Sequence, residues 1–140
     1  IDVQGNQRAL IDGGVFVNSP VVSAYAEALK LYPNEPLMVV SLGTGELVRP
    51  IPYDSAKDWG QAGWVMPLID CMFDGATKAA NHQMRMFLGD RYIRLQVTLD
   101  EANDDMDDAS ETNIENLKRI ADRLIRENEA TLSRILSLNL

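Results

Sequence analysis

Apolar residues follow two different spacings along the chain, and each spacing predicts one kind of element. The short apolar run at residues 9–12 predicts a buried strand that ends at Asp12, just before a glycine turn. The continuous apolar run at 37–42 predicts a second strand, covered on both faces as in a parallel sheet. Residues 92–97 alternate between apolar and polar and predict a third strand.

Residues with helical spacing occupy the two intervals between the three predicted strands. Ser19 and Pro20 predict the start of a helix, with serine as the N-cap and proline in the first turn, and this helix extends to about Leu31. Residues 59–88 are also mostly helical in pattern. Glycines and Pro67 interrupt this segment, so we expect two helices there.

The C-terminal part of the chain predicts a loop followed by an amphipathic helix. Residues 100–111 are rich in acidic side chains and predict a solvated loop. Thr112 and Glu115 have the spacing of a capping box at the start of a helix, which we expect to continue to Leu140. Its predicted apolar stripe consists of Ile114, Leu117, Ala121, Leu124 and Ile125.

The order of these elements predicts the fold class. Strands alternate with helices, which favours an α/β fold with a largely parallel sheet flanked by helices. Interior strands need a neighbour on each side, and three strands do not provide enough of them. We therefore expect the sheet to be incomplete in this chain.

Composition narrows the possible functions. The 140 residues are 46% hydrophobic and 24% charged, as in ordinary globular domains, and their apolar stretches are too short to span a membrane. The net charge of −8 disfavours binding to nucleic acid. Cys71 is the sole cysteine and has no partner for an internal disulfide, so we expect a small core residue rather than a nucleophile.

Asp12 is the best candidate for chemistry. A carboxylate at the carboxyl end of a buried strand lies where open α/β sheets bind their ligands. Gly13 and Gly14 allow the backbone to turn sharply and another group to approach. The carboxylate is then placed to accept a proton from a nearby hydroxyl. The alternative is an ordinary Asp-Gly turn with no catalytic role.

Four short motifs in order along the chain resemble the patatin-like phospholipase family. They are Asp12–Gly14, Asn18–Pro20, Ser41–Gly45 and Tyr92–Leu95, and the resemblance extends from residue 10 to about 126. It implies a three-layer patatin-like α/β fold. It also implies a Ser-Asp dyad in which the aspartate, here Asp12, pairs with a serine from a G-x-S-x-G turn. That chemistry requires no histidine, metal or cofactor.

The serine of this dyad is not found in the chain. Ser41 comes nearest, but Val39 stands where the first glycine of the motif should be, and the family's glycine-rich oxyanion loop is also absent. We therefore expect residues 1–140 to be the C-terminal part of one acyl hydrolase domain, with the nucleophile in its N-terminal part. The expected substrate is a lipid or acyl ester, with possible peripheral membrane contact and a cytoplasmic location.

Other features allow competing interpretations. The whole chain could be a non-catalytic α/β scaffold or binding module related to patatins. We expect His82 to lie on a helix surface, Gly43–Gly45 to form a tight strand exit rather than a phosphate cradle, and the acidic loop to bind no calcium. A Met-rich apolar segment predicts core packing or, alternatively, a lid or lipid-facing surface; it contains Trp59, Trp64, Met66, Met72, Met84, Met86 and Phe87.

Overall fold

The computed structural model describes residues 2–3, 5–7, 9–47, 50–105 and 107–137. Contacts within the chain divide it into two compact units, one of residues 1–39 and 51–92 and the other of residues 40–50 and 93–140. The elements are mostly helical, with a small parallel sheet. The predicted α/β class is therefore confirmed, and the sheet is incomplete.

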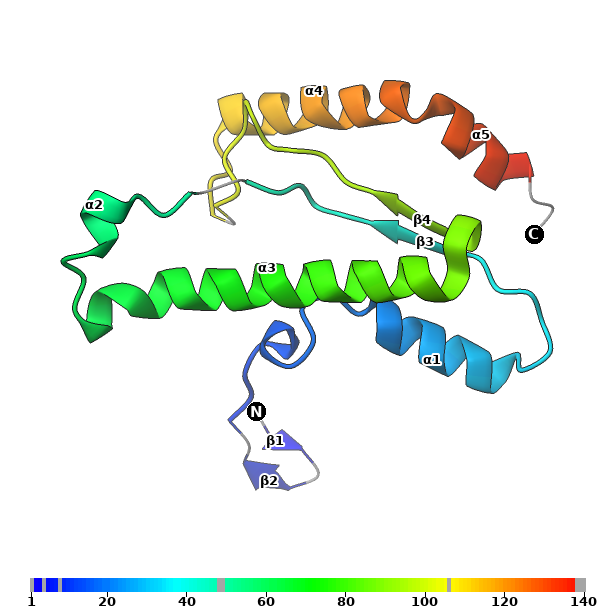
Figure 1. The fold of residues 1–140 in the computed structure, drawn as a ribbon, viewed down its shortest axis with the longest axis horizontal. Coiled ribbons are helices and arrows are strands. Elements are labelled where there is room, and N and C mark those ends of the chain that lie inside the picture. The colour runs from blue at the N-terminus through cyan, green and yellow to red at the C-terminus, as the bar shows by residue number, and fades with distance from the viewer. Residues whose placement is uncertain (1, 4, 8, 48–49, 106, 138–140) are drawn as a thin grey trace. The chain divides into compact units, whose positions relative to one another are not determined.

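The first unit is built mainly of helices (Figure 1). It begins with a short antiparallel hairpin that the sequence pattern did not predict. Its elements are β1 (Asp2–Val3), β2 (Asn6–Gln7), η1 (Gly13–Val15), α1 (Val21–Leu31), α2 (Tyr53–Ala56), α3 (Gln61–Leu88) and η2 (Gly89–Arg91).

The core of this unit lies where α1 packs against α3, beside the C-terminal half of α3 in Figure 1. Met84 is fully buried, with 0% of its surface exposed, among Val21, Leu88 and Tyr92. The hydroxyl of Tyr92 donates a hydrogen bond to the side-chain oxygen of Asn81, so the polar end of this core tyrosine is satisfied.

Three predictions for this unit need correction. Residues 9–12 form no strand, and Ile11 is 80% exposed, because a strand needs a second backbone to pair with and none of the described segments supplies it. The helix α1 is confirmed, but it begins after Pro20 and receives no side-chain cap from Ser19. Residues 61–88 form one helix rather than two, since Pro67 removes only a single backbone hydrogen bond.

The second unit contains most of the sheet. Strand β3 (Val39–Leu42) pairs with β4 (Tyr92–Leu95), and the parallel pairing continues past the strand ends to a bridge between Glu46 and Thr98. The amide of Gly43 donates to the carbonyl of Leu95 at 2.8 Å. The sheet has two described strands rather than the three expected, because residues 9–12 are not part of it.

The two strands differ in burial. Strand β3 alternates, with Leu42 72% exposed, so the prediction that both of its faces are covered is wrong for this chain. Strand β4 is buried at Tyr92, Ile93 and Leu95, although its sequence alternates. Strand β3 has the continuous apolar sequence of a strand covered on both faces, but Val40 and Leu42 leave one of its faces exposed.

Helices α4 (Glu111–Glu127) and α5 (Glu129–Ser137) follow the acidic loop and break at Asn128. The expected single helix is thus two. The buried positions on α4 are Asn113 and Ile120, whereas Ile114 and Ile125 of the predicted stripe are exposed. The face that packs is therefore rotated from the one that apolar spacing alone predicted.

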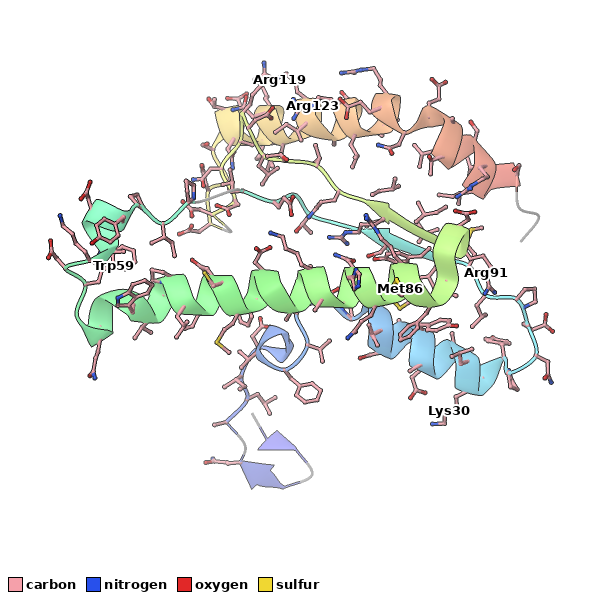
Figure 2. The ribbon with its side chains drawn as sticks, viewed as in Figure 1. Lys30, Trp59, Met86, Arg91, Arg119 and Arg123 are labelled. Atoms are coloured by element: carbon pink, nitrogen blue, oxygen red, sulfur yellow. The ribbon has the colours of Figure 1, made fainter. Side chains whose placement is uncertain are left out.

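The acidic loop is organised around the buried side chain of Asn113. Its oxygen accepts from the backbone of Asn103 at 2.8 Å, and its amide donates to the carbonyls of Asn103 and Asp108. Arg123, labelled in Figure 2, donates two hydrogen bonds to Asp100 at 2.6 and 2.8 Å. These hydrogen bonds lower the pKa of the Asp100 carboxyl and raise that of the Arg123 guanidinium.

The observed N-cap of α4 differs from the one that the sequence predicted, and substitutions can test this difference. The hydroxyl of Ser110 accepts from the Asn113 amide at 3.3 Å, whereas the sequence pattern placed a capping box at Thr112. We expect Ser110→Ala to lower the free energy of unfolding by about 1 kcal/mol, because one amide of the first turn loses its acceptor. Thr112→Ala should change it by less than about 0.5 kcal/mol. Urea denaturation of both variants compares them, and the reverse order would contradict the assignment.

Candidate functional site

The Asp12-Gly13-Gly14 segment forms a tight turn. Asp12 is the N-cap of η1, and its Oδ1 accepts a hydrogen bond from the Gly14 amide at 2.6 Å. The backbone carbonyl of Asp12 accepts from the amide of Val15 at 3.2 Å. The carboxylate therefore has one oxygen fixed by the turn, while Oδ2 has no hydrogen-bond partner among the described residues.

The two glycines are not equivalent. A Cβ atom added at Gly14 would lie 3.0 Å from Oδ1 of Asp12, whereas one added at Gly13 would meet nothing within 4 Å. Both glycines were expected to serve the turn. Only Gly14 is in a position where a side chain would press directly on the carboxylate.

Asp12 is exposed to solvent in this chain. A pocket begins two residues further on, at Gly14, and Asp12 is not among the residues that line it. The geometry brings the carboxylate to the edge of a hollow without placing it inside. Its role as a proton acceptor remains a prediction.

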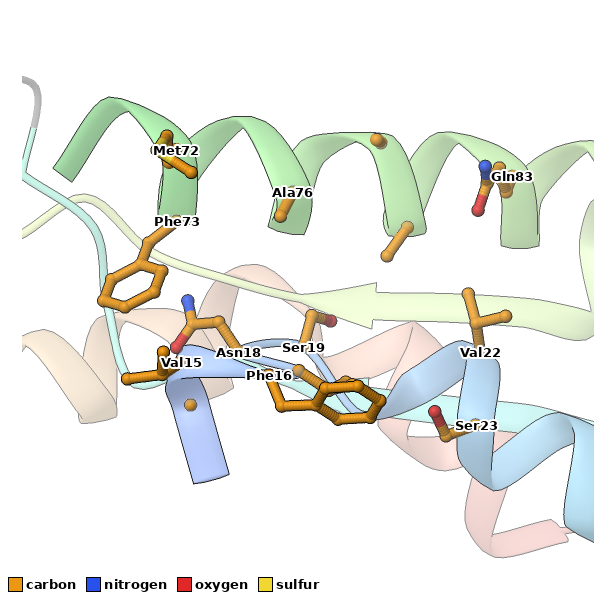
Figure 3. Close-up of a pocket in the computed structure, with 14 residues that line it drawn as sticks. Val15, Phe16, Asn18, Ser19, Val22, Ser23, Met72, Phe73, Ala76 and Gln83 are labelled. Atoms are coloured by element: carbon orange, nitrogen blue, oxygen red, sulfur yellow. The ribbon is translucent and has the colours of Figure 1, made fainter. Parts of the chain in front are cut away.

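The pocket has a volume of about 350 Å³ and lies between the Gly14–Ser19 segment, the start of α1 and the middle of α3. Figure 3 shows Phe73 on α3 extending toward the segment that carries Val15 and Asn18, and Met72 also lines the pocket. The side-chain amide of Asn18 donates to the hydroxyl of Thr77 at 3.2 Å, which ties this segment to α3.

The lining of the pocket is mostly apolar, with a few amide and hydroxyl groups. The lining residues are Gly14, Val15, Phe16, Val17, Asn18, Ser19, Val22, Ser23, Met72, Phe73, Ala76, Ala79, Ala80 and Gln83. Such a surface suits the apolar part of a ligand, with Asn18, Ser19, Ser23 and Gln83 as its polar side chains.

The other candidate residues lie elsewhere. His82 is exposed on α3, as expected. Cys71 is exposed as well, so the prediction of a core cysteine is wrong for this chain. The Gly43–Gly45 segment forms a tight strand exit: Oε1 of Gln96 accepts from the Gly45 amide at 3.1 Å and occupies the space beside Gly43.

Two further predictions concern the acidic loop, which was expected to bind no calcium, and the Met-rich segment, for which core packing was the first of two interpretations. Among the described residues, no group of three or more His, Cys, Asp or Glu side chains is arranged to hold a metal ion. Core packing is observed for Met84 only, whereas most of the Met-rich segment is exposed, including Met66, Met72, Met86 and Phe87.

Comparison with known proteins tests the family resemblance that the sequence motifs suggested. No family model matches the chain. No solved structure matches it. The chain is similar to patatin-like proteins of Arabidopsis thaliana.

Three of these relatives show the extent of the similarity. Patatin-like protein 6 is 29% identical over 91% of the chain, patatin-like protein 1 is 28% identical over 89%, and patatin-like protein 4 is 27% identical over 85%. The chain spans 29–37% of the length of these relatives. The similarity to patatin-like proteins thus extends over most of the chain and supports the resemblance drawn from its motifs.

The sequence pattern missed the residues that form the pocket. Asn18 belongs to a motif, but its partner Thr77 lies 59 positions away, and no local pattern pairs them. Phe16 and Phe73 also line the pocket from separate elements. Helical spacing places Phe73 on α3 but does not reveal what faces it.

Gly13 and Gly14 differ in the space beside them, so substitutions at these two positions form a matched pair of variants. On the prediction from sequence that Asp12 accepts a proton during ester hydrolysis, we expect Gly14→Ala to displace its carboxylate by a few tenths of an ångström and to lower hydrolysis by the whole protein about 10-fold or more. Gly13→Ala should leave hydrolysis within about twofold, because its added methyl group meets open space. Initial rates with a p-nitrophenyl acyl ester measure both. Equal losses in the two variants would show that the close approach at Gly14 does not matter.

Proposed function

We propose that this chain is part of a patatin-like lipid acyl hydrolase in which Asp12 accepts a proton from a serine hydroxyl. The serine is contributed by another part of the same protein. Similarity to three patatin-like proteins over 85–91% of the chain supports the family. The observation that carries the site is a carboxylate held by the Gly14 amide at the edge of a mostly apolar pocket.

The proposed reaction has two balanced steps. The serine hydroxyl attacks the ester carbonyl as its proton passes to Asp12, and Asp12 returns this proton to the leaving alkoxide as the acyl-enzyme forms. Water then attacks the acyl-enzyme and gives a proton to the same carboxylate, which passes it to the serine oxygen as the fatty acid is released. Backbone amides of the upstream glycine-rich loop stabilise the oxyanion, each worth about 2.7–4 kcal/mol in comparable sites.

The turn at Asp12 suits this role chemically. Because Gly14 occupies Oδ1, Oδ2 can face the incoming serine, and the backbone holds the carboxylate in one orientation. The apolar lining of the pocket matches the hydrocarbon part of an acyl ester.

Labelling with a fluorophosphonate probe tests this function. We expect the whole protein to be labelled on one serine and to hydrolyse a p-nitrophenyl acyl ester. The 140-residue chain alone should do neither, since its sequence has no serine in a G-x-S-x-G context. A whole protein that folds but neither reacts with the probe nor hydrolyses the ester would favour the alternative of a non-catalytic α/β module.

A further inference from the structure

Residues 12–18 form one locally hydrogen-bonded segment, which we call the Asp12 segment. The Gly14 amide donates to the Asp12 carboxylate at 2.6 Å. The Val17 amide donates to the carbonyl of Gly13 at 2.9 Å. Because these bonds join residues at most four positions apart, they fix the shape of the segment but not its position relative to the helices.

A side-chain hydrogen bond ties the Asp12 segment to helix α3. The side-chain amide of Asn18 donates to the hydroxyl of Thr77 at 3.2 Å, across 59 positions of sequence. Figure 3 shows the Asn18 side chain extending toward α3. Within the described part of the chain, no other side-chain hydrogen bond joins residues 12–18 to another element. This bond is therefore a specific link between the Asp12 turn and α3.

The side chain of Asn18 also lies close to the Asp12 carboxylate. A Cβ atom added at Gly14 would lie 3.0 Å from Oδ1 of Asp12 and 3.6 Å from Oδ1 of Asn18. Both oxygen atoms are thus on the same side of Gly14. The position of Asn18, which Thr77 holds, is therefore coupled to the position of the carboxylate.

We propose that Asn18 and Thr77 are positioning residues, whose hydrogen bond holds the Asp12 carboxylate where it can take the serine proton. The proposal rests on the proposed function for the role of Asp12. Proton transfer requires hydrogen-bond reach, about 2.6–3.2 Å. A misplacement of about 1 Å can lower a rate 100-fold. A link outside the turn matters because the local bonds of the Asp12 segment persist when the whole segment shifts.

Thr77 separates this role from direct contact with a ligand. Asn18 lines the pocket, so a substitution there also alters the surface that a ligand would meet. Thr77 is half-buried on α3 and is not among the residues that line the pocket. A substitution at position 77 therefore removes the hydrogen bond and leaves the lining residues unchanged.

Amide hydrogen exchange in the whole protein tests the link itself. Thr77→Val keeps the shape of the side chain and removes the hydroxyl, whereas Thr77→Ser keeps the hydroxyl. We expect the Gly14 and Val17 amides to exchange about 5-fold faster in Thr77→Val, because losing one hydrogen bond favours local opening. Asn18→Ala, which removes the donor, should show the same increase, and Thr77→Ser should match the parent. Unchanged exchange in Thr77→Val and Asn18→Ala would overturn the proposal.

Steady-state kinetics with a p-nitrophenyl acyl ester test the consequence for catalysis. We expect Thr77→Val to lower kcat about 10-fold with little change in KM, since a proton acceptor acts in the transition state. Thr77→Ser should retain most of the parent kcat. Thr131→Val, the same substitution at a half-buried position on α5, is the matched control and should retain it as well. A raised KM with unchanged kcat, or a lower melting temperature alone, would contradict a positioning role.

A double variant shows whether Thr77 acts through Asp12. In the Asp12→Asn background, Thr77→Val should lower the rate no further, because the proton acceptor that it positions is already lost. A second loss of about 10-fold in this background would show that Thr77 acts on another part of the site.

Hydrogen exchange does not depend on turnover, so failure of this proposal is distinguishable from failure of the proposed function. Full activity of Asp12→Asn would remove the proposed function, and with it the positioning role, even where exchange shows the link. A large loss in Asp12→Asn with the parent kcat in Thr77→Val would retain the proposed function and remove the positioning role alone.

Discussion

Asp12→Asn in the whole protein is expected to lower ester hydrolysis by about 10²–10⁴-fold, the usual contribution of a positioned general base. Asparagine has nearly the same shape, and its side-chain oxygen can still accept from the Gly14 amide at the 2.6 Å contact. It cannot take up the proton of the serine. The fold should therefore survive while the proton acceptor is lost.

The measurement is the initial rate with a p-nitrophenyl acyl ester, alongside the circular dichroism and melting temperature of each protein. Asp54→Asn is the matched control, because Asp54 is an exposed acid on α2 whose partner is the neighbouring Lys57 at 3.0 Å. We expect the rate of this control to stay within about twofold of the parent. Full activity of Asp12→Asn, or an equal loss in the control, would remove Asp12 from the mechanism.

Met84→Ala has the largest expected effect on stability. Met84 is fully buried between α1 and α3, so truncation leaves a cavity among Val21, Leu88 and Tyr92. Substitutions of this kind cost about 2–5 kcal/mol. Urea denaturation of the whole protein should show this loss. Lys30→Ala, on the exposed side of α1, should stay within about 0.5 kcal/mol of the parent.

The Met84 result also bears on the site. Helices α1 and α3 hold two sides of the pocket, so a weakened core should loosen the segment that carries Asn18. A variant with a stability within about 0.5 kcal/mol of the parent would mean that this core does not hold the helices together.

Local sequence patterns predicted those elements whose apolar spacing and boundary residues lie within the element itself. Helix α1 and strand β4 were predicted near their observed positions, because each carries its own spacing and boundary residues. The loop before α4 was also predicted, although Ser110 rather than Thr112 caps the helix. Both residues are good caps, and the packing of Asn113 decides between them.

The features that were missed depend on contacts, or on missing contacts, between segments that are far apart in sequence, and a local sequence pattern does not show such contacts. The segment at 9–12 has the composition of a strand but no backbone beside it to pair with. Cys71 and Met72 look like core residues, yet they are exposed on α3. Each of these departures is an apolar segment without a cover, as expected if the covering element is contributed by the remainder of a longer protein.

The candidate site was predicted only in part. The Asp12-Gly13-Gly14 turn is visible in sequence because its interactions are local, and the Gly14 amide contact follows from the turn. The pocket is not visible, because it combines Phe16 with Phe73 from distant elements. The hydroxyl proposed to face Asp12 has no candidate in a G-x-S-x-G context within these 140 residues.

A crystal structure of the whole protein carrying a fluorophosphonate adduct addresses the dyad itself. The adduct marks the nucleophilic serine, and the distance from its Oγ to the nearest carboxylate oxygen of Asp12 is then measured directly. We expect hydrogen-bond reach, about 2.6–3.2 Å. An adduct on a serine far from Asp12, with the Asp12 carboxylate still in open solvent, would contradict the proposal that these two residues act together.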